Sequence, residues 1–109
     1  MSKNRAGSDW KLFRKLQQVA LERLCERALA DIKEAASDES QSSHERFLAS
    51  YKLMHEYNDD VASAFDHLSR SRMHVHLARM QALNLIDAED LAEFSEETRD
   101  IVATLVRYE

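Results

Sequence analysis

The stretch that decides the fold is Ser42 to Asn84, SSHERFLASYKLMHEYNDDVASAFDHLSRSRMHVHLARMQALN. Its apolar residues recur every three or four positions, the spacing that places side chains on one side of an α-helix. The stripe consists of Phe47, Tyr51, Met54, Asn58, Val61, Phe65 and Leu68, of which only Asn58 is polar. We therefore expect one very long helix or two nearly collinear helices, with the stripe as the core seam or the dimer seam.

The segment Asn58-Asp59-Asp60 is the ambiguous point of this helix. Asn58 has a good N-cap side chain, so a separate helix that begins at Asp59 is one interpretation. The apolar spacing continues unchanged across the segment, which favours a continuous helix that is bent there. An amide inside an apolar seam can also fix the register and the number of chains in a bundle.

The composition predicts an all-α protein. The 109 residues include one glycine, Gly7, and no proline, so little interrupts a helix and little supplies the positive φ angles that tight hairpins need. With 44% hydrophobic and 32% charged residues in a periodic pattern, the chain is expected to fold. We expect one domain, residues 8–109, behind a flexible leader at residues 1–7.

Helix signals on both sides of the central stretch predict an antiparallel bundle. Ser8 is an N-cap candidate for a first long helix that ends near Ala36, and Asp9 adds negative charge to its first turn. Arg23 and Arg27 belong to the polar face of this helix, which we expect to be solvated or to await a partner. The polar linker 37–43 suits an antiparallel return of the chain.

The second long helix and two short C-terminal helices carry their own start signals. Ser42 and Glu45 have the spacing of a capping box at the start of the long helix. Asp87 and Ser95 are N-cap candidates for the two short helices. The predicted architecture is thus two long antiparallel helices with two short helices folded against them.

The two long helices are predicted to need a partner. Helices roughly 40 to 60 Å long cannot be covered on all sides by about a hundred residues, so we expect dimerisation to complete the bundle. The leading functional hypothesis is a homodimeric, non-enzymatic adaptor or regulatory module, and a different protein partner is possible in its place. No catalytic arrangement of residues accompanies the seam.

A basic cluster supplies the alternative function. Three arginines and three histidines lie between Asp66 and Asp87 with no acid among them: His67, Arg70, Arg72, His74, His76 and Arg79. On a helix, they form two trios about 140° apart, and either trio could hold a phosphate. Anion or nucleic-acid binding is therefore the alternative. The competing interpretation is that the cluster pairs with the acidic segments 21–60 and 87–109, and the net charge of −5 argues against a general polyanion binder.

Metal, thiol and membrane functions are not expected. His74 and His76 diverge by about 200° on a helix, so they do not chelate one ion, and no metal or cofactor is predicted. Cys25 is the only cysteine and is expected to be a buried, inert thiol. The segment MSKNRAGSDWK lacks the apolar core of a signal peptide, and no apolar run has the length of a membrane span, so we expect a cytoplasmic location.

Overall fold

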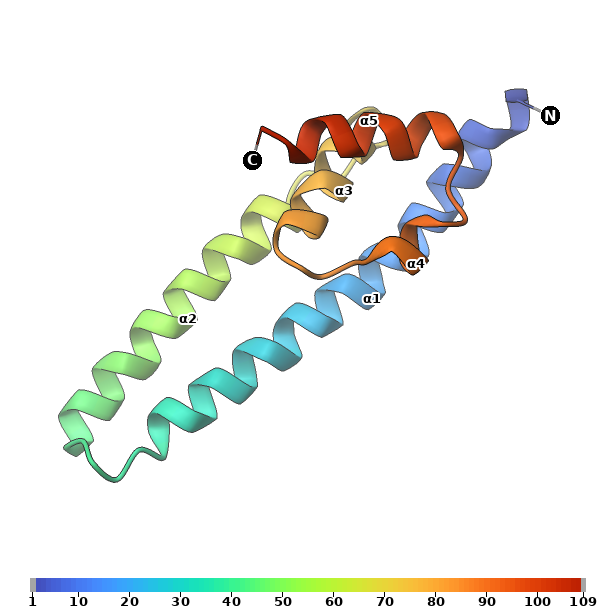
Figure 1. The fold of residues 1–109 in the computed structure, drawn as a ribbon. Coiled ribbons are helices and arrows are strands. Elements are labelled where there is room, and N and C mark those ends of the chain that lie inside the picture. Colours follow the sequence, from blue (N-terminus) through green and yellow to red (C-terminus); the bar gives the residue numbers. More distant parts are fainter. Residues whose placement is uncertain (1, 109) are drawn as a thin grey trace.

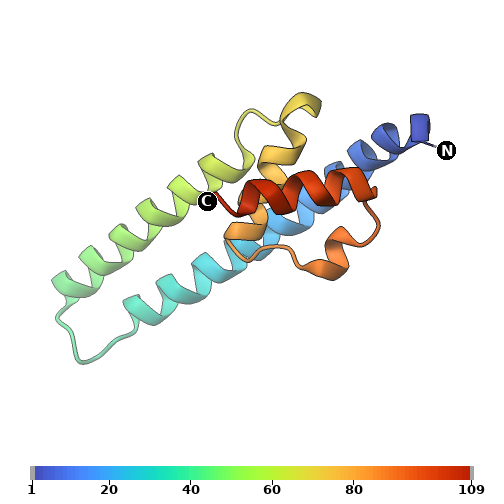
Figure 2. The same ribbon diagram turned by 45° about the horizontal axis from the view of Figure 1, so that its top comes forward.

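The computed structural model describes the backbone of residues 2–108 and the side chains of residues 7–108, and this part of the chain is helical without strands. The elements are α1 (Ser2–Ala36), α2 (Ser43–Phe65), the 3₁₀ helix η1 (Arg70–Arg72), α3 (Met73–Ala82), α4 (Ala88–Leu91) and α5 (Glu96–Val106). Helices α1 and α2 form a long antiparallel hairpin, and α3, α4 and α5 gather at the end away from the connecting loop (Figures 1 and 2). The all-α prediction and the pairing of two long helices are confirmed.

The start of α1 differs from the prediction. The helix begins at Ser2, so Ser8 and Asp9 lie inside it and the predicted N-cap at Ser8 is wrong. One glycine costs a helix only about 1 kcal/mol relative to alanine, so Gly7 does not have to end it. Met1 lies outside the described residues, and the flexibility of residues 1–7 stays a prediction.

Helix α2 begins as predicted. The Ser42 hydroxyl accepts a hydrogen bond from the Glu45 backbone N–H at 3.1 Å, and the Glu45 carboxylate accepts one from the Ser42 N–H at 2.9 Å. This capping box satisfies two of the N–H groups that a helix start leaves without intrahelical partners. The helix then continues without interruption through Asn58 and Asp60, as the unbroken apolar spacing indicated.

The long helix does not extend to Asn84. It ends at Phe65, Asp66 adopts an extended conformation, and His67 has a positive φ of 59°. The chain turns here because α3 can then bury Met73, Leu77 and Met80 at the junction of helices, whereas a straight continuation would carry them into solvent. The expectation of collinear helices is therefore wrong beyond Phe65.

The end of α3 is a Schellman motif that sequence reasoning overlooked. Asn84 has a φ of 59°, and its N–H donates to the Gln81 carbonyl at 2.9 Å. The Leu85 N–H donates to the Met80 carbonyl, also at 2.9 Å, and the side chains of Leu85 and Met80 are both buried. Asparagine tolerates the left-handed conformation better than most residues, which suits it to this position.

The two C-terminal helices begin at their predicted caps. The Asp87 carboxylate accepts from the Asp90 N–H at 3.0 Å, and the Asp90 carboxylate accepts from the Asp87 N–H at 3.0 Å. The Ser95 hydroxyl accepts from the Thr98 N–H at 3.3 Å. Local capping chemistry therefore fixes where α4 and α5 start.

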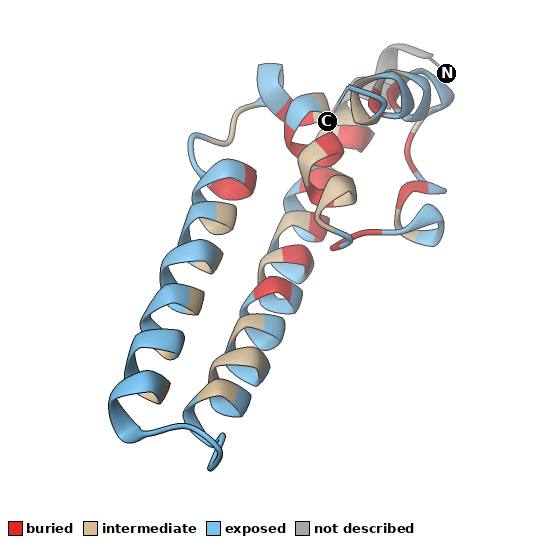
Figure 3. Ribbon diagram, turned by 60° about the vertical axis from the view of Figure 1, so that its left-hand side comes forward, coloured by how far each residue is buried: buried red, intermediate tan, exposed pale blue. Residues whose placement is uncertain are grey.

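The hydrophobic core lies at one end of the molecule. Its largest fully buried apolar side chains come from α1, α3, the segment after α3 and α5: Phe13, Leu24, Leu77, Met80, Leu85 and Val102. Residues 25–63, the far half of the hairpin, contain no buried residue, as Figure 3 shows by colour. The Cα radius of gyration of 16.9 Å exceeds the value of about 13 Å expected for a compact chain of this length.

The predicted seam is therefore divided. Phe65 is buried, and Val61 and Leu68 are partly buried. The rest of the seam is solvent-exposed and is not core within this chain: Phe47, Tyr51, Met54 and Asn58. In this half α2 turns its adjacent face, with the partly buried Leu53 and Tyr57, towards α1. The sequence pattern identified the apolar stripe but not that α3 to α5 would cover only one end of it.

Candidate functional site

The six residues of the predicted basic cluster do not form one site. The turn after Phe65 separates them: His67 lies in the connection, and Arg70 and Arg72 lie on η1. These three side chains are exposed. The other three lie on α3 and contact other parts of the chain, so the predicted trios on one helix are wrong.

Arg79 links α3 to α2. Its Nε donates to the Ser63 hydroxyl at 3.0 Å, and its Nη2 lies 3.8 Å from the Asp60 carboxylate. This ion pair joins one residue of the basic cluster to the acidic segment 21–60, as expected if the cluster pairs with acids of the same chain. Arg79 therefore serves packing here.

His76 is a core residue, 2% exposed. Its Nδ1 lies 2.7 Å from the carbonyl oxygen of Ala64, so Nδ1 carries the proton and donates it to this bond. The Ala64 carbonyl belongs to the last turn of α2, where carbonyl groups lack intrahelical donors. His76 thus caps α2 from α3, and its ring is too deeply buried to bind an external anion.

His74 belongs to a polar network that joins the first and last helices. Asp9 is 3% exposed, and its carboxylate accepts from the Ser95 N–H at 3.0 Å and from the Ser95 and Thr98 hydroxyls, both at 2.6 Å. His74 Nε2 lies 3.4 Å from the Thr98 hydroxyl. The carboxylate therefore lies at the N-terminus of α5, where the helix dipole favours negative charge.

The environment of Asp9 keeps its carboxyl ionised. Burial raises the pKa, but the hydrogen bonds from Ser95 and Thr98 together outweigh it, with a smaller contribution from His74, so the pKa lies below 3.8. The network has the residue types of a hydrolase triad but not its arrangement. The Ser95 and Thr98 hydroxyls both donate to Asp9, so neither gives its proton to His74 as the serine of a triad does to its histidine.

Two arginines on the polar face of α1 bind backbone carbonyls elsewhere in the chain. Arg23 donates to the Leu85 carbonyl at 2.8 Å, and Arg27 donates to the Leu83 and Asn84 carbonyls at 2.8 and 2.9 Å. Arg23 also pairs with Asp90 at 2.8 Å. The two guanidinium groups thus satisfy carbonyls at and after the C-terminal end of α3. The i,i+4 spacing of Arg23 and Arg27 is visible in the sequence, but the carbonyls that they bind lie more than fifty residues away.

One pair of basic residues is brought together only by the fold. The Arg14 guanidinium carbon lies 5.8 Å from the centroid of the Trp10 ring, and that of Arg70 lies 5.7 Å from the same centroid. Phe13 stacks on Trp10 with ring centroids 5.5 Å apart. Both arginines are exposed, and neither forms an ion pair within the described part of the chain.

The exposure of Cys25 corrects one expectation, and the absence of a bound metal stays a prediction. Cys25 is exposed, so the expectation of a buried thiol is wrong. Among residues 2–108 no group of three or more His, Cys, Asp or Glu side chains is placed to hold a metal ion. Over the same residues, no helix has the length and apolar composition needed to cross a bilayer.

The far half of the hairpin presents large apolar side chains to solvent. We call these residues the hairpin face: Leu29, Phe47, Leu48, Tyr51 and Met54, each at least half exposed. Helical spacing turns Phe47, Tyr51 and Met54 to one side of α2, and it turns Leu29 to the same side of the hairpin. That side is opposite the one where Asp60 and Arg27 contact α3 and its C-terminal connection.

No family model, curated protein or solved structure matches the chain.

Proposed function

We propose that this chain is a non-enzymatic interaction module that forms a homodimer through the hairpin face. The observation that carries the proposal is the exposure of Phe47 at 67%, Tyr51 at 64% and Met54 at 53% along one side of α2. A cytoplasmic location stays a prediction, supported by a single cysteine that permits no intrachain disulfide.

The size of the hairpin face supports a role in binding. A side chain of this size that is half to two-thirds exposed presents on the order of 100 Å² to water, so the five residues present roughly 500 Å². Apolar patches of this extent on small proteins commonly mark interaction sites. A second protein surface would bury them at about 25 cal/mol per Å² of apolar area.

The shape of the molecule favours a second copy as the occupant. The far half of the hairpin is only two helices thick, whereas α3 to α5 thicken the other end (Figure 3). Two hairpins packed face to face would form a four-helix bundle over about 24 Å, the length of α2 from Ser43 to Asn58. The contact would be isologous, because the same stripe would serve both chains.

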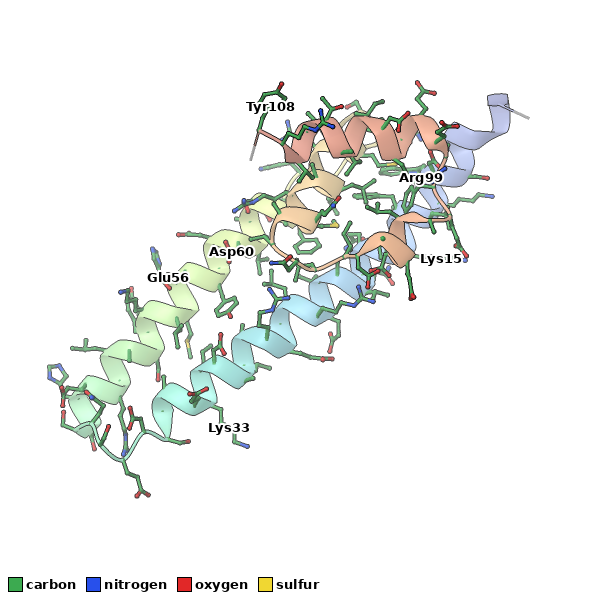
Figure 4. The ribbon with its side chains drawn as sticks, viewed as in Figure 1. Lys15, Lys33, Glu56, Asp60, Arg99 and Tyr108 are labelled. Atoms are coloured by element: carbon green, nitrogen blue, oxygen red, sulfur yellow. The ribbon has the colours of Figure 1, made fainter. Side chains whose placement is uncertain are left out.

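The experiment is analytical ultracentrifugation of Phe47→Asp and Tyr51→Asp beside the wild type. Each substitution places a charge at the proposed contact, so we expect a dimer in the wild type and monomers in the variants at micromolar concentration. Tyr108→Asp is the matched control, because Tyr108 is 85% exposed and extends from the chain after α5 (Figure 4). Variants that sediment like the wild type would show that the hairpin face is not the contact.

A further inference from the structure

We infer that Lys11, Arg14 and Arg70 form a surface that binds the phosphate groups of a nucleic-acid strand without reading its bases. The juxtaposition that carries the inference is that of Arg14 on α1 and Arg70 on η1, whose guanidinium groups share one indole ring, that of Trp10. The inference is independent of the proposed dimer, since these residues lie near the opposite end of the hairpin from its loop (Figure 1).

The fold holds two like charges close together. Each guanidinium carbon is less than 6 Å from the Trp10 centroid, so the two groups are no further apart than about twice that distance. The ring attracts both cations, and the buried Phe13 stacks on the indole at an interplanar angle of 21°. Trp10 therefore orders two arginines that would otherwise repel each other.

The three cations take part in no ion pair within the described residues. The only acid of residues 1–20 is Asp9, which is buried and directs its carboxylate to Ser95 and Thr98. The described ion pairs involve other cations, and none includes Lys11, Arg14 or Arg70. Exposed arginines without carboxylate partners are suited to bidentate contacts with phosphate.

Lys11 belongs to the patch and Lys15 does not. Lys11 precedes Arg14 by three positions on α1, so the two side chains are neighbours on one face, and both are exposed. Lys15 instead lies beside α4 (Figure 4), where it borders a shallow groove with Glu89 and Glu93. The patch thus consists of Arg14 and Arg70, which share the Trp10 ring, and of Lys11 beside Arg14 on α1.

The exposure of these cations favours one class of ligand. All three side chains are exposed, and cations on an open surface suit the repeated charges of a phosphodiester backbone better than the single phosphate of a modified peptide. Because Phe13 and the two arginines occupy the surroundings of the Trp10 ring, the indole is not available for stacking on bases. Binding should therefore depend on backbone charge and be indifferent to base identity.

The experiment uses Trp10 as the reporter, since it is the only tryptophan of the chain. The full chain is titrated with single-stranded oligonucleotides of about 12 nucleotides, with inorganic phosphate, and with a phosphoserine peptide, while Trp10 fluorescence and oligonucleotide anisotropy are followed. Contacts to about three phosphates predict an affinity that falls about 20-fold between about 50 and 200 mM salt. An oligo-dT and an oligo-dA strand should bind equally well.

Arg70→Gln and Arg14→Gln should each weaken oligonucleotide binding by about 3- to 10-fold and reduce the salt dependence. Arg99→Gln is the matched control, because Arg99 is an exposed arginine on α5 (Figure 4) and should leave binding unchanged. Far-UV circular dichroism checks that each variant folds. The inference is overturned if oligonucleotide binding is absent, if Arg14→Gln and Arg70→Gln leave it unchanged, or if only free phosphate or the phosphopeptide responds.

Discussion

Asp9, in the third turn of α1, accepts hydrogen bonds from the backbone and the hydroxyl of Ser95, which caps the last helix of the chain. The contact joins residues 86 positions apart and places a buried carboxylate at the N-terminus of α5. Asp9 is predicted to lie in the first turn of the first helix, but it binds instead at the N-terminus of the last helix. It ties the end of the chain to α1.

Replacing Asp9 should destabilise the protein strongly. Asp9→Ala leaves the Ser95 N–H and the Thr98 hydroxyl without their acceptor, so we expect a loss of about 3 kcal/mol in the free energy of unfolding. Urea unfolding followed by circular dichroism measures it. Asp100→Ala, an exposed acid on the same helix α5, is the control and should cost less than about 0.5 kcal/mol. Equal losses in both variants would contradict the buried network.

The same carboxylate predicts an acid-dependent loss of stability. The pKa of Asp9 is lowered from 3.8 in the folded chain, so the unfolded chain binds its proton more readily. Its contribution is complete above the unfolded pKa and is lost as the pH falls through the folded pKa. Between about pH 5 and about pH 2, the wild type should therefore lose more stability than Asp9→Asn. Parallel pH profiles for the two proteins would show that Asp9 is not the group responsible.

The left-handed conformation of Asn84 gives a test of the Schellman motif. At a φ of 59°, a residue with a Cβ and no short polar side chain is strained, so Asn84→Ala should destabilise by about 1 kcal/mol. Asn84→Gly should be neutral or slightly stabilising, because glycine adopts positive φ without steric cost. Thermal unfolding of the two variants measures this difference in stability. Alanine and glycine variants of equal stability would contradict the assigned conformation.

Arg27 should stabilise the end of α3 locally. Its guanidinium bonds to the carbonyls of Leu83 and Asn84, and Arg27→Ala should cost about 1 kcal/mol because these contacts are exposed. Amide hydrogen exchange at Leu83 to Leu85 should accelerate. Lys33→Ala, on the same helix and exposed near its end (Figure 4), should leave exchange at these residues unchanged. Unaltered exchange in Arg27→Ala would mean that the contacts do not hold in solution.

The elements that depend on local chemistry were predictable from the sequence. The caps at Ser42, Asp87 and Ser95 each rest on a side chain that reaches a backbone N–H within three residues, so sequence spacing suffices. The turn after Phe65 was not predictable, because no proline or glycine marks it and the helical spacing continues towards Leu68. Long-range burial of α3 determines it instead.

The candidate sites were predictable only in part. The apolar stripe from Phe47 to Phe65 was visible as a periodicity, but which part of it remained exposed depended on where α3 to α5 packed. The basic cluster at 67–79 was divided by the unforeseen turn. Arg70 lies instead beside Arg14 and Trp10. These residues are about sixty positions away from it in the sequence, and only the fold brings them together.

The most direct test of the proposed dimer is the absolute mass of the wild-type chain by light scattering after size exclusion, at low and at high salt. Burial of the hairpin face is mainly apolar, so we expect about twice the chain mass of 12.6 kDa at both salt concentrations. A mass of one chain at micromolar concentration would contradict homodimerisation.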